Sequence, residues 1–282
     1  MSVNSKMTAI ADEIRAKTGG TEPLSLDDMA ENVPKVYESG QNDVKEQVEP
    51  INTELEKCLS GNPVDGKSWY DEFWDLYLSR CEQVGYQYAF AGRGWHYDTF
   101  FPTRDIILKN GASYVFQETY MLPLKQCLDK NGVKLDTSNM TNMDRLFYWA
   151  MQGSNSGHII PPIGNNNVTS AQYCFYVATG LEKIEKLTVA PTCNMTEAFF
   201  RCDALREITL ENEIASSTWK FNNTHMLSRE TITHIIGKLS EATTGLSITL
   251  SSAAVTNAFE SVYSEEWQAL VSSKPNWTIS LV

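Results

Sequence analysis

Residues 175–184, FYVATGLEKI, and residues 199–208, FFRCDALREI, share one pattern. Each segment begins with an aromatic residue, has a small residue three positions later, and then Leu at six and Ile at nine. The two copies start 24 residues apart, and earlier copies start at Phe147 and, more faintly, at Phe116. A repeat of this length is typical of a solenoid, because no single unit can bury its own apolar face and neighbours must stack to form a core.

Short strands and turns are expected between the copies. We predict strands at Leu187–Val189 and Ile208–Leu210, and turns in the polar stretches 153–157 and 164–167. The fold class that follows is α+β, with short parallel strands joined by helical or loop returns.

The last third of the chain departs from simple repetition. Ser228 is expected to cap a helix with one apolar face, formed by Ile232, Ile235, Ile236 and Leu239. Alternation predicts strands at 246–250 and 277–281, with a helix through Trp267 and Leu270 between them. We interpret this region as a terminal cap, because an uncapped stack exposes its core and a bare strand edge.

Residues 1–40 predict two short amphipathic helices separated by Gly19-Gly20. A hairpin of this size is too small to be stable alone, so we expect it to dock on another protein. The apolar residues expected to form this anchor are Ile10, Ile14, Leu26, Met29 and Val33.

Residues 41–60 are polar, but their apolar residues have heptad-like spacing, namely Val44, Val48, Ile51, Leu55 and Cys58. Two heptads interrupted by Pro50 fit either a solvated helical linker or a short coiled coil that brings copies of the chain together, for example as a trimer. Turn residues after position 60 mark a boundary, and we assign 61–282 to the repeat domain. Its first helix, opened by Ser68, is expected to cap the stack with an apolar stripe of Trp69, Phe73, Leu76 and Tyr77.

Composition excludes several classes of protein. The formal net charge of −12 disfavours nucleic acid and anionic membrane surfaces as partners, because both attract clustered Lys and Arg. The sequence has no apolar stretch long enough to span a membrane and no secretory signal, so membrane insertion and export are not expected. The six cysteines form no CxxC pair, which predicts reduced thiols and no zinc site.

No motif for catalysis or cofactor binding is present. The four histidines stand outside hydrolase and metalloprotease patterns, and no phosphate-binding loop occurs. Asp71, Glu72 and Asp75 offer nearby carboxylates of the kind that a glycosidase needs, yet proximity is expected by chance among 35 acidic residues. We therefore predict a protein without enzymatic activity, cofactor or metal, which binds through exposed aromatic residues near turns: Trp95, Tyr97, Phe100 and Trp149.

Two stretches resemble known families. Residues 135–147, LDTSNMTNMDRLF, and residues 199–210 resemble the repeat units of BspA-like proteins with irregular leucine-rich repeats. Residues 10–29, IADEIRAKTGGTEPLSLDDM, are similar to the opening of tail-associated proteins from phages and prophages of Gram-positive bacteria.

Together, these resemblances imply a phage tail, baseplate or tail-fibre protein. Its N-terminus would bind other tail proteins, and its repeat domain would bind a glycan or protein on the host surface. Such a protein is expected in the virion tail after assembly in the host cytoplasm. The alternatives are a purely architectural tail protein and a BspA-like bacterial surface adhesin, and the second would need an export signal that the sequence lacks.

Overall fold

A computed structural model describes residues 8, 11, 12, 15, 69–84, 86–87, 89–91, 101–119, 123–152 and 157–282. The chain separates into two compact units, Met1–Ser79 and Arg80–Val282, and nearly all described residues belong to the second. Apart from residues 8, 11, 12 and 15, the predicted anchor and the heptad segment lie outside the described residues, including Ile10, Ile14, Leu26, Met29 and Val33.

Helix α4 (Trp69–Val84) runs across the boundary between the two units. Its Trp74 and Leu78 side chains are fully buried, whereas Leu76 is 49% exposed. The prediction that Leu76 belongs to the apolar stripe of this helix is therefore wrong. Residues four apart share a helix face, so the buried face contains Trp74 and Leu78, and Leu76 points away from it.

The strands of the second unit form three small sheets, and every strand pair is parallel. The first sheet pairs β1 (Ile106–Lys109) with β2 (Leu135–Asn139). The second is built on β5 (Leu181–Thr188), which pairs along one edge with β3 (His158–Ile160) and then β4 (Ile163–Gly164), and along the other edge with β6 (Glu207–Leu210). The third has the order β7 (Lys220–Phe221), β8 (Leu246–Leu250) and β9 (Trp277–Leu281).

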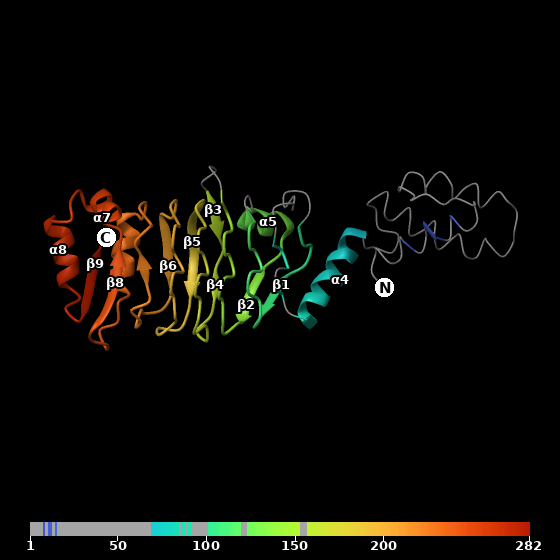
Figure 1. The fold of residues 1–282 in the computed structure, drawn as a ribbon, viewed down its shortest axis with the longest axis horizontal. Helices are drawn as coiled ribbons and strands as arrows, with labels where there is room; N and C mark the ends of the chain where they lie inside the picture. The colour runs from blue at the N-terminus through green and yellow to red at the C-terminus, as the bar shows by residue number, and fades with distance from the viewer. Residues whose placement is uncertain are drawn as a thin grey trace, which may run out of the picture. The chain divides into compact units, whose positions relative to one another are not determined.

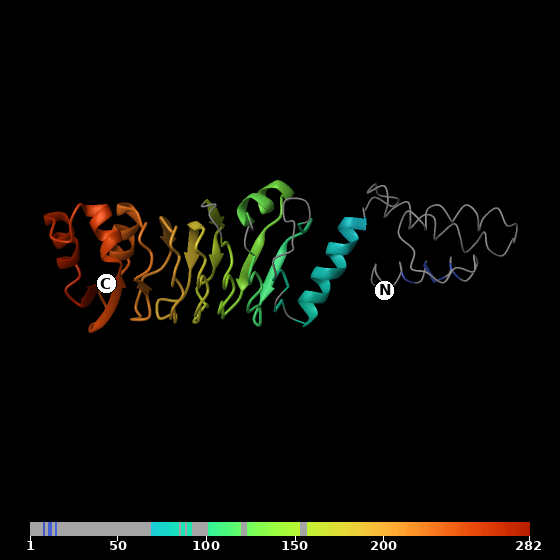
Figure 2. The same ribbon diagram turned by 45° about the horizontal axis from the view of Figure 1, so that its top comes forward.

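Helices connect some of these strands. Helix α5 (Leu124–Asn131) lies between β1 and β2 in the chain, and α6 (Arg229–Gly237) follows β7. Helices α7 (Ser252–Phe259) and α8 (Glu265–Ser272) lie between β8 and β9. Within the second unit, the strands follow one another in a row from β1 to β9 (Figures 1 and 2). The second unit therefore mixes helices with small parallel sheets, as the α+β prediction requires, and none of the sheets of described strands closes on itself.

Several predicted elements are confirmed in the last third. Ser228 caps α6, because its Oγ accepts a hydrogen bond from the Thr231 N–H at 3.2 Å. Strands β8 and β9 have the predicted bounds, and α8 contains Trp267. Helix α7, capped by Ser251, was not predicted, and β5 begins at Leu181, six residues before the predicted strand at Leu187.

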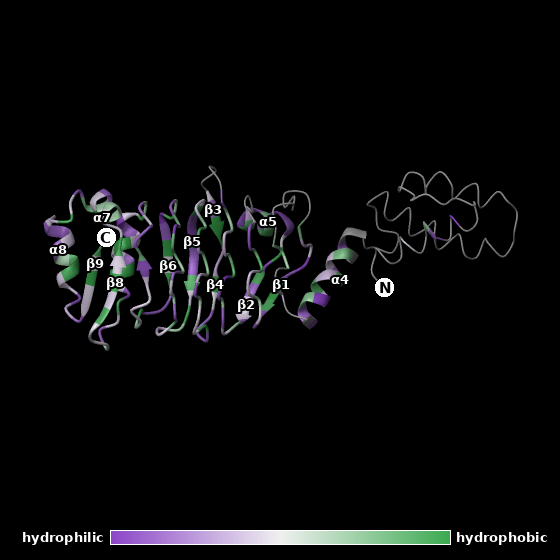
Figure 3. Cartoon of the chain, in the orientation of Figure 1, coloured by the Kyte–Doolittle hydropathy of each residue, from purple (hydrophilic) through white to green (hydrophobic). Residues whose placement is uncertain are grey.

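The core of the second unit is a column of phenylalanine rings. Neighbouring rings in this column are stacked with centroids 4.6–5.7 Å apart, and all of them are 0% exposed: Phe90, Phe116, Phe147, Phe175, Phe199 and Phe221. Apolar residues also recur along the strands beside them (Figure 3). The repeat pattern predicted the buried layer, since Ala178, Leu181 and Ile184 are also fully buried. Burial of one such ring contributes roughly 1.5–3 kcal/mol to stability.

Candidate functional site

Four five-residue segments repeat the same backbone turn, and we call them the turn segments: residues 114–118, 145–149, 173–177 and 197–201. The first and last residue of each has a positive φ of 54–58°, although none is glycine. Left-handed conformations are uncommon for such residues and unfavourable for a β-branched residue such as Val177. The third residue of each segment is a ring of the phenylalanine column: Phe116, Phe147, Phe175 and Phe199.

Hydrogen bonds between consecutive turn segments maintain this conformation. The backbone N–H groups at the first, third and fifth positions donate to carbonyl oxygens of the next segment or of the residue just before it, with N···O distances of 2.7–3.3 Å. For example, Phe147 donates to Cys174 at 2.8 Å, and Trp149 donates to Tyr176 at 2.8 Å. Each segment is therefore held in fixed register against the next, and equivalent side chains come to lie beside one another.

The outward side chains of these segments form a second aromatic array. The rings of Tyr148 and Tyr176 stack with centroids 5.1 Å apart, and those of Tyr176 and Phe200 stack at 5.0 Å. The Arg145 guanidinium lies 5.6 Å from the Tyr114 ring centroid and 5.0 Å from that of Tyr173, within the range of a cation–π interaction. We call this set the aromatic face: Tyr114, Arg145, Tyr148, Trp149, Tyr173, Tyr176 and Phe200.

Trp149 is the most exposed residue of the aromatic face, with 38% of its surface accessible, and the other members are half-buried. Its ring is nearly parallel to that of Tyr148, at an angle of 5° and a centroid distance of 6.0 Å. Trp149, one of the four residues predicted to bind a partner, therefore belongs to the aromatic face. Trp95, Tyr97 and Phe100 lie outside the described residues.

The other members of the aromatic face were not predicted from the sequence. A signal for three of them exists, because Tyr148, Tyr176 and Phe200 each follow the repeated phenylalanine directly. Arg145, Tyr114 and Tyr173 each lie two residues before it, but that position does not keep one residue type, and their proximity arises from the register between turn segments.

Burial raises the pKa of Tyr148, and the neighbouring phenols of Tyr176 and Tyr114 raise it further. The Tyr148 hydroxyl therefore remains protonated at neutral pH and can both donate and accept hydrogen bonds. The aromatic face combines ring edges, phenolic hydroxyls and a guanidinium, which suits binding of an amphipathic ligand.

The carboxylates considered for glycoside cleavage are only partly described: Asp71 and Asp75 lie one turn apart on α4, and the Glu72 side chain lies outside the described residues. Among the described residues, no group of three or more His, Cys, Asp or Glu side chains could hold a metal ion. No described helix is both long enough and apolar enough to cross a membrane. No family model matches the chain, and no curated protein or solved structure shows significant similarity to it.

Proposed function

We propose that this chain is a non-enzymatic phage tail, baseplate or tail-fibre protein whose repeat domain attaches to a molecule on the host surface. The observation that carries the proposal is the aromatic face, which the repeats hold in fixed register. Tyr, Trp and Arg are the residues most enriched where protein interfaces gain their binding energy, and this surface is composed almost entirely of them.

We further propose that the second unit is an irregular leucine-rich-repeat solenoid. Three features support this: the parallel pairing of its strands, the phenylalanine column with one ring per repeat, and the hydrogen bonds between consecutive turn segments. In such a stack each unit contacts mainly its neighbours, so outward residues can vary without disturbing the core. A stack of this kind therefore suits the display of a binding surface.

The rigidity of the aromatic face favours recognition. Stacked tyrosine rings lose little conformational freedom on binding, and they offer apolar area and hydroxyl groups together. A glycan or a protein could be bound by such groups. The tail assignment comes from the resemblance of residues 10–29 and 135–147 to tail-associated and BspA-like proteins.

Binding of the labelled full chain to a panel of Gram-positive cells tests the proposal. We expect binding that is selective between strains, with at least about tenfold loss in Tyr176→Ala and in Trp149→Ala, because interface hot spots contribute 2 kcal/mol or more. Tyr263→Ala is the matched control, since Tyr263 is an aromatic residue outside the aromatic face and is 85% exposed.

Periodate treatment of the cells separates the two kinds of receptor, because it destroys glycans and leaves proteins largely intact. Loss of binding after treatment would identify a glycan. If the folded protein binds no strain, the receptor-binding role is wrong and an architectural role takes its place. If binding survives both aromatic substitutions, the aromatic face is the wrong surface.

A further inference from the structure

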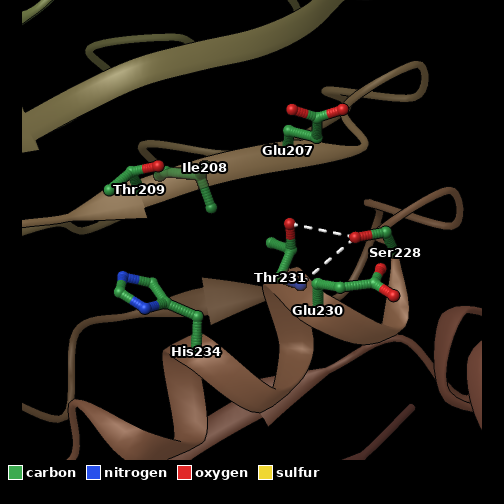
Figure 4. A pocket seen from close by; sticks show the side chains of 7 residues that line it. All are labelled: Glu207, Ile208, Thr209, Ser228, Glu230, Thr231 and His234. Atoms are coloured by element: carbon green, nitrogen blue, oxygen red, sulfur yellow. Dashed lines mark hydrogen bonds between the residues drawn. The ribbon is translucent and has the colours of Figure 1, made fainter.

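A cavity of about 560 Å³ opens between β6 and α6. Figure 4 shows the β6 residues on one side, facing α6 and its N-cap on the other. It shares no residue with the aromatic face, and its lining consists of Glu207, Ile208, Thr209, Ser228, Glu230, Thr231 and His234.

The cavity exists because the element beside the second edge of β6 is a helix, where a further strand could have paired. Strand β6 pairs with β5 along one edge, and α6 packs beside its other edge. Two hydrogen bonds flank the cavity on that second edge. The Ser228 N–H donates to the Arg206 carbonyl at 3.0 Å, and the Leu210 N–H donates to His234 Nε2 at 2.9 Å. The space between these two contacts is the cavity.

Between those contacts, β6 presents an open backbone position at Ile208. Both the N–H and the C=O of Leu210 lie within hydrogen-bond distance of His234 Nε2, whereas the Glu211 N–H donates to Leu187 on the β5 side. Backbone groups alternate between the two edges of a strand, so Ile208 presents its N–H and C=O on the same side as Leu210. A donor and an acceptor that face the same side complement a ligand that presents an acceptor and a donor beside each other, such as an amide oxygen next to a hydroxyl group.

Acidic and hydroxyl side chains surround that position. Glu207 forms an ion pair with Lys183 at 2.6 Å, but Glu230 forms none with the described residues. Its own backbone N–H and then the Ser228 hydroxyl lower the pKa of Glu230, so it is a carboxylate at neutral pH. Carboxylates accept hydrogen bonds from ligand hydroxyls and repel anionic ligands.

We propose that this cavity binds an N-acetylated amino sugar, whose acetamido oxygen accepts a hydrogen bond from the Ile208 N–H and whose hydroxyls donate to the Ile208 carbonyl, Glu230 and Glu207. Its biological meaning rests on the proposed function, as a second contact with a host glycan. Its chemistry can be tested separately. The ligand is neutral and carries a secondary amide beside hydroxyl groups, and the cavity is large enough for one or two sugar rings.

The test is titration of the full chain with N-acetylglucosamine, glucosamine or glucose, with binding measured by ligand-observed NMR. We expect saturable binding of N-acetylglucosamine and about tenfold weaker binding of the other two, because a site that pairs with an amide discriminates against ligands without one. Preferred binding of glucosamine or glucose would overturn the proposal.

Two variants locate the binding. Thr209→Trp fills the cavity from an exposed strand position and should abolish binding, and Glu230→Ala should weaken it about tenfold by removing a charged acceptor. Glu213→Ala is the matched control, because Glu213 is an exposed acid that does not line the cavity. A thermal melt of each variant confirms that it folds.

The outcome also separates this proposal from the proposed function. Cell binding that depends on Tyr176, together with no N-acetylglucosamine binding, would overturn the cavity proposal and leave receptor attachment standing. Sugar binding that persists in Thr209→Trp would place the sugar elsewhere and would equally overturn it. Sugar binding that is lost in Thr209→Trp supports the cavity even if no cell is bound.

Discussion

The phenylalanine column and the aromatic face are built from adjacent residues and behave in opposite ways. Phe147 and Phe175 stack at 5.7 Å and are fully buried, and the next residues, Tyr148 and Tyr176, stack at 5.1 Å and are half-buried. One backbone turn thus places one ring inside and the next outside in the repeats that contain Phe147, Phe175 and Phe199. The inner array is expected to determine stability and the outer array recognition, so the two properties can change independently.

The largest effect expected from this comparison is in the inner array. Phe175→Ala should lower the free energy of unfolding by about 3–5 kcal/mol, because it leaves a cavity between Phe147 and Phe199 and removes two stacking contacts. Tyr176→Ala should lower it by about 1 kcal/mol, since that ring is already partly hydrated. Urea denaturation of both variants measures the difference, and equal losses would contradict the division between the two arrays.

A second test uses pH, because burial raises the pKa of the Cys193 thiol to about 12, with a further contribution from Asp144. The folded protein then holds a proton that the unfolded chain releases near pH 9, so this thiol stabilises the fold below that pH. Its contribution is lost as pH rises from 9 toward 12, at up to about 1.4 kcal/mol per pH unit.

We therefore expect urea denaturation to give a lower stability at pH 10 than at pH 8, with a smaller difference in Cys193→Ala than in the unchanged chain. The absolute stability of that variant does not matter, because only its change with pH is compared. An identical change with pH in both proteins would show that Cys193 does not titrate in this range.

The repeat pattern predicted the inner array better than the outer one. Phe175 and Phe199 could be identified because a small residue, Leu and Ile follow at fixed positions, and Phe147 because a similar aromatic start and small residue recur there, whereas Phe90 and Phe221 lie where the pattern has diverged. Apolar periodicity reports burial, so it identifies a core and not a binding surface.

The outer array was only partly predictable for a physical reason. Trp149 was identified by its place near a turn, but the approach of Arg145 to Tyr114 depends on register across 31 residues. The left-handed residues were equally hidden, because the usual marker of that conformation is glycine and these positions carry other residues. The cavity beside β6 was missed because it results from the gap between a strand and a helix, which no local pattern encodes.

A smaller effect tests whether hydrogen bonding between the turn segments imposes backbone strain. Val177 has a φ of 58°, which disfavours a β-branched residue by about 1–2 kcal/mol. Val177→Gly should raise the free energy of unfolding by about 0.5 kcal/mol, after the greater chain entropy of glycine is subtracted. Ala178→Gly, next to it at an ordinary φ, should lower it by about 0.5–1 kcal/mol. If thermal melts show that Val177→Gly stabilises the protein and Ala178→Gly destabilises it, backbone strain at Val177 is supported. Destabilisation by both substitutions would refute it.

The smallest effect is expected for charges on the surface of the same repeats. Lys186 and Glu211 form an ion pair at 3.2 Å, and both side chains are about half exposed. Water screens such a pair, so Lys186→Gln should change the free energy of unfolding by less than about 0.5 kcal/mol, and added salt should reduce even that difference. A loss as large as that of Tyr176→Ala would mean that outward contacts stabilise the repeats regardless of their chemistry. Substitutions on the outer surface would then affect stability as well as binding, and the two properties could not change independently.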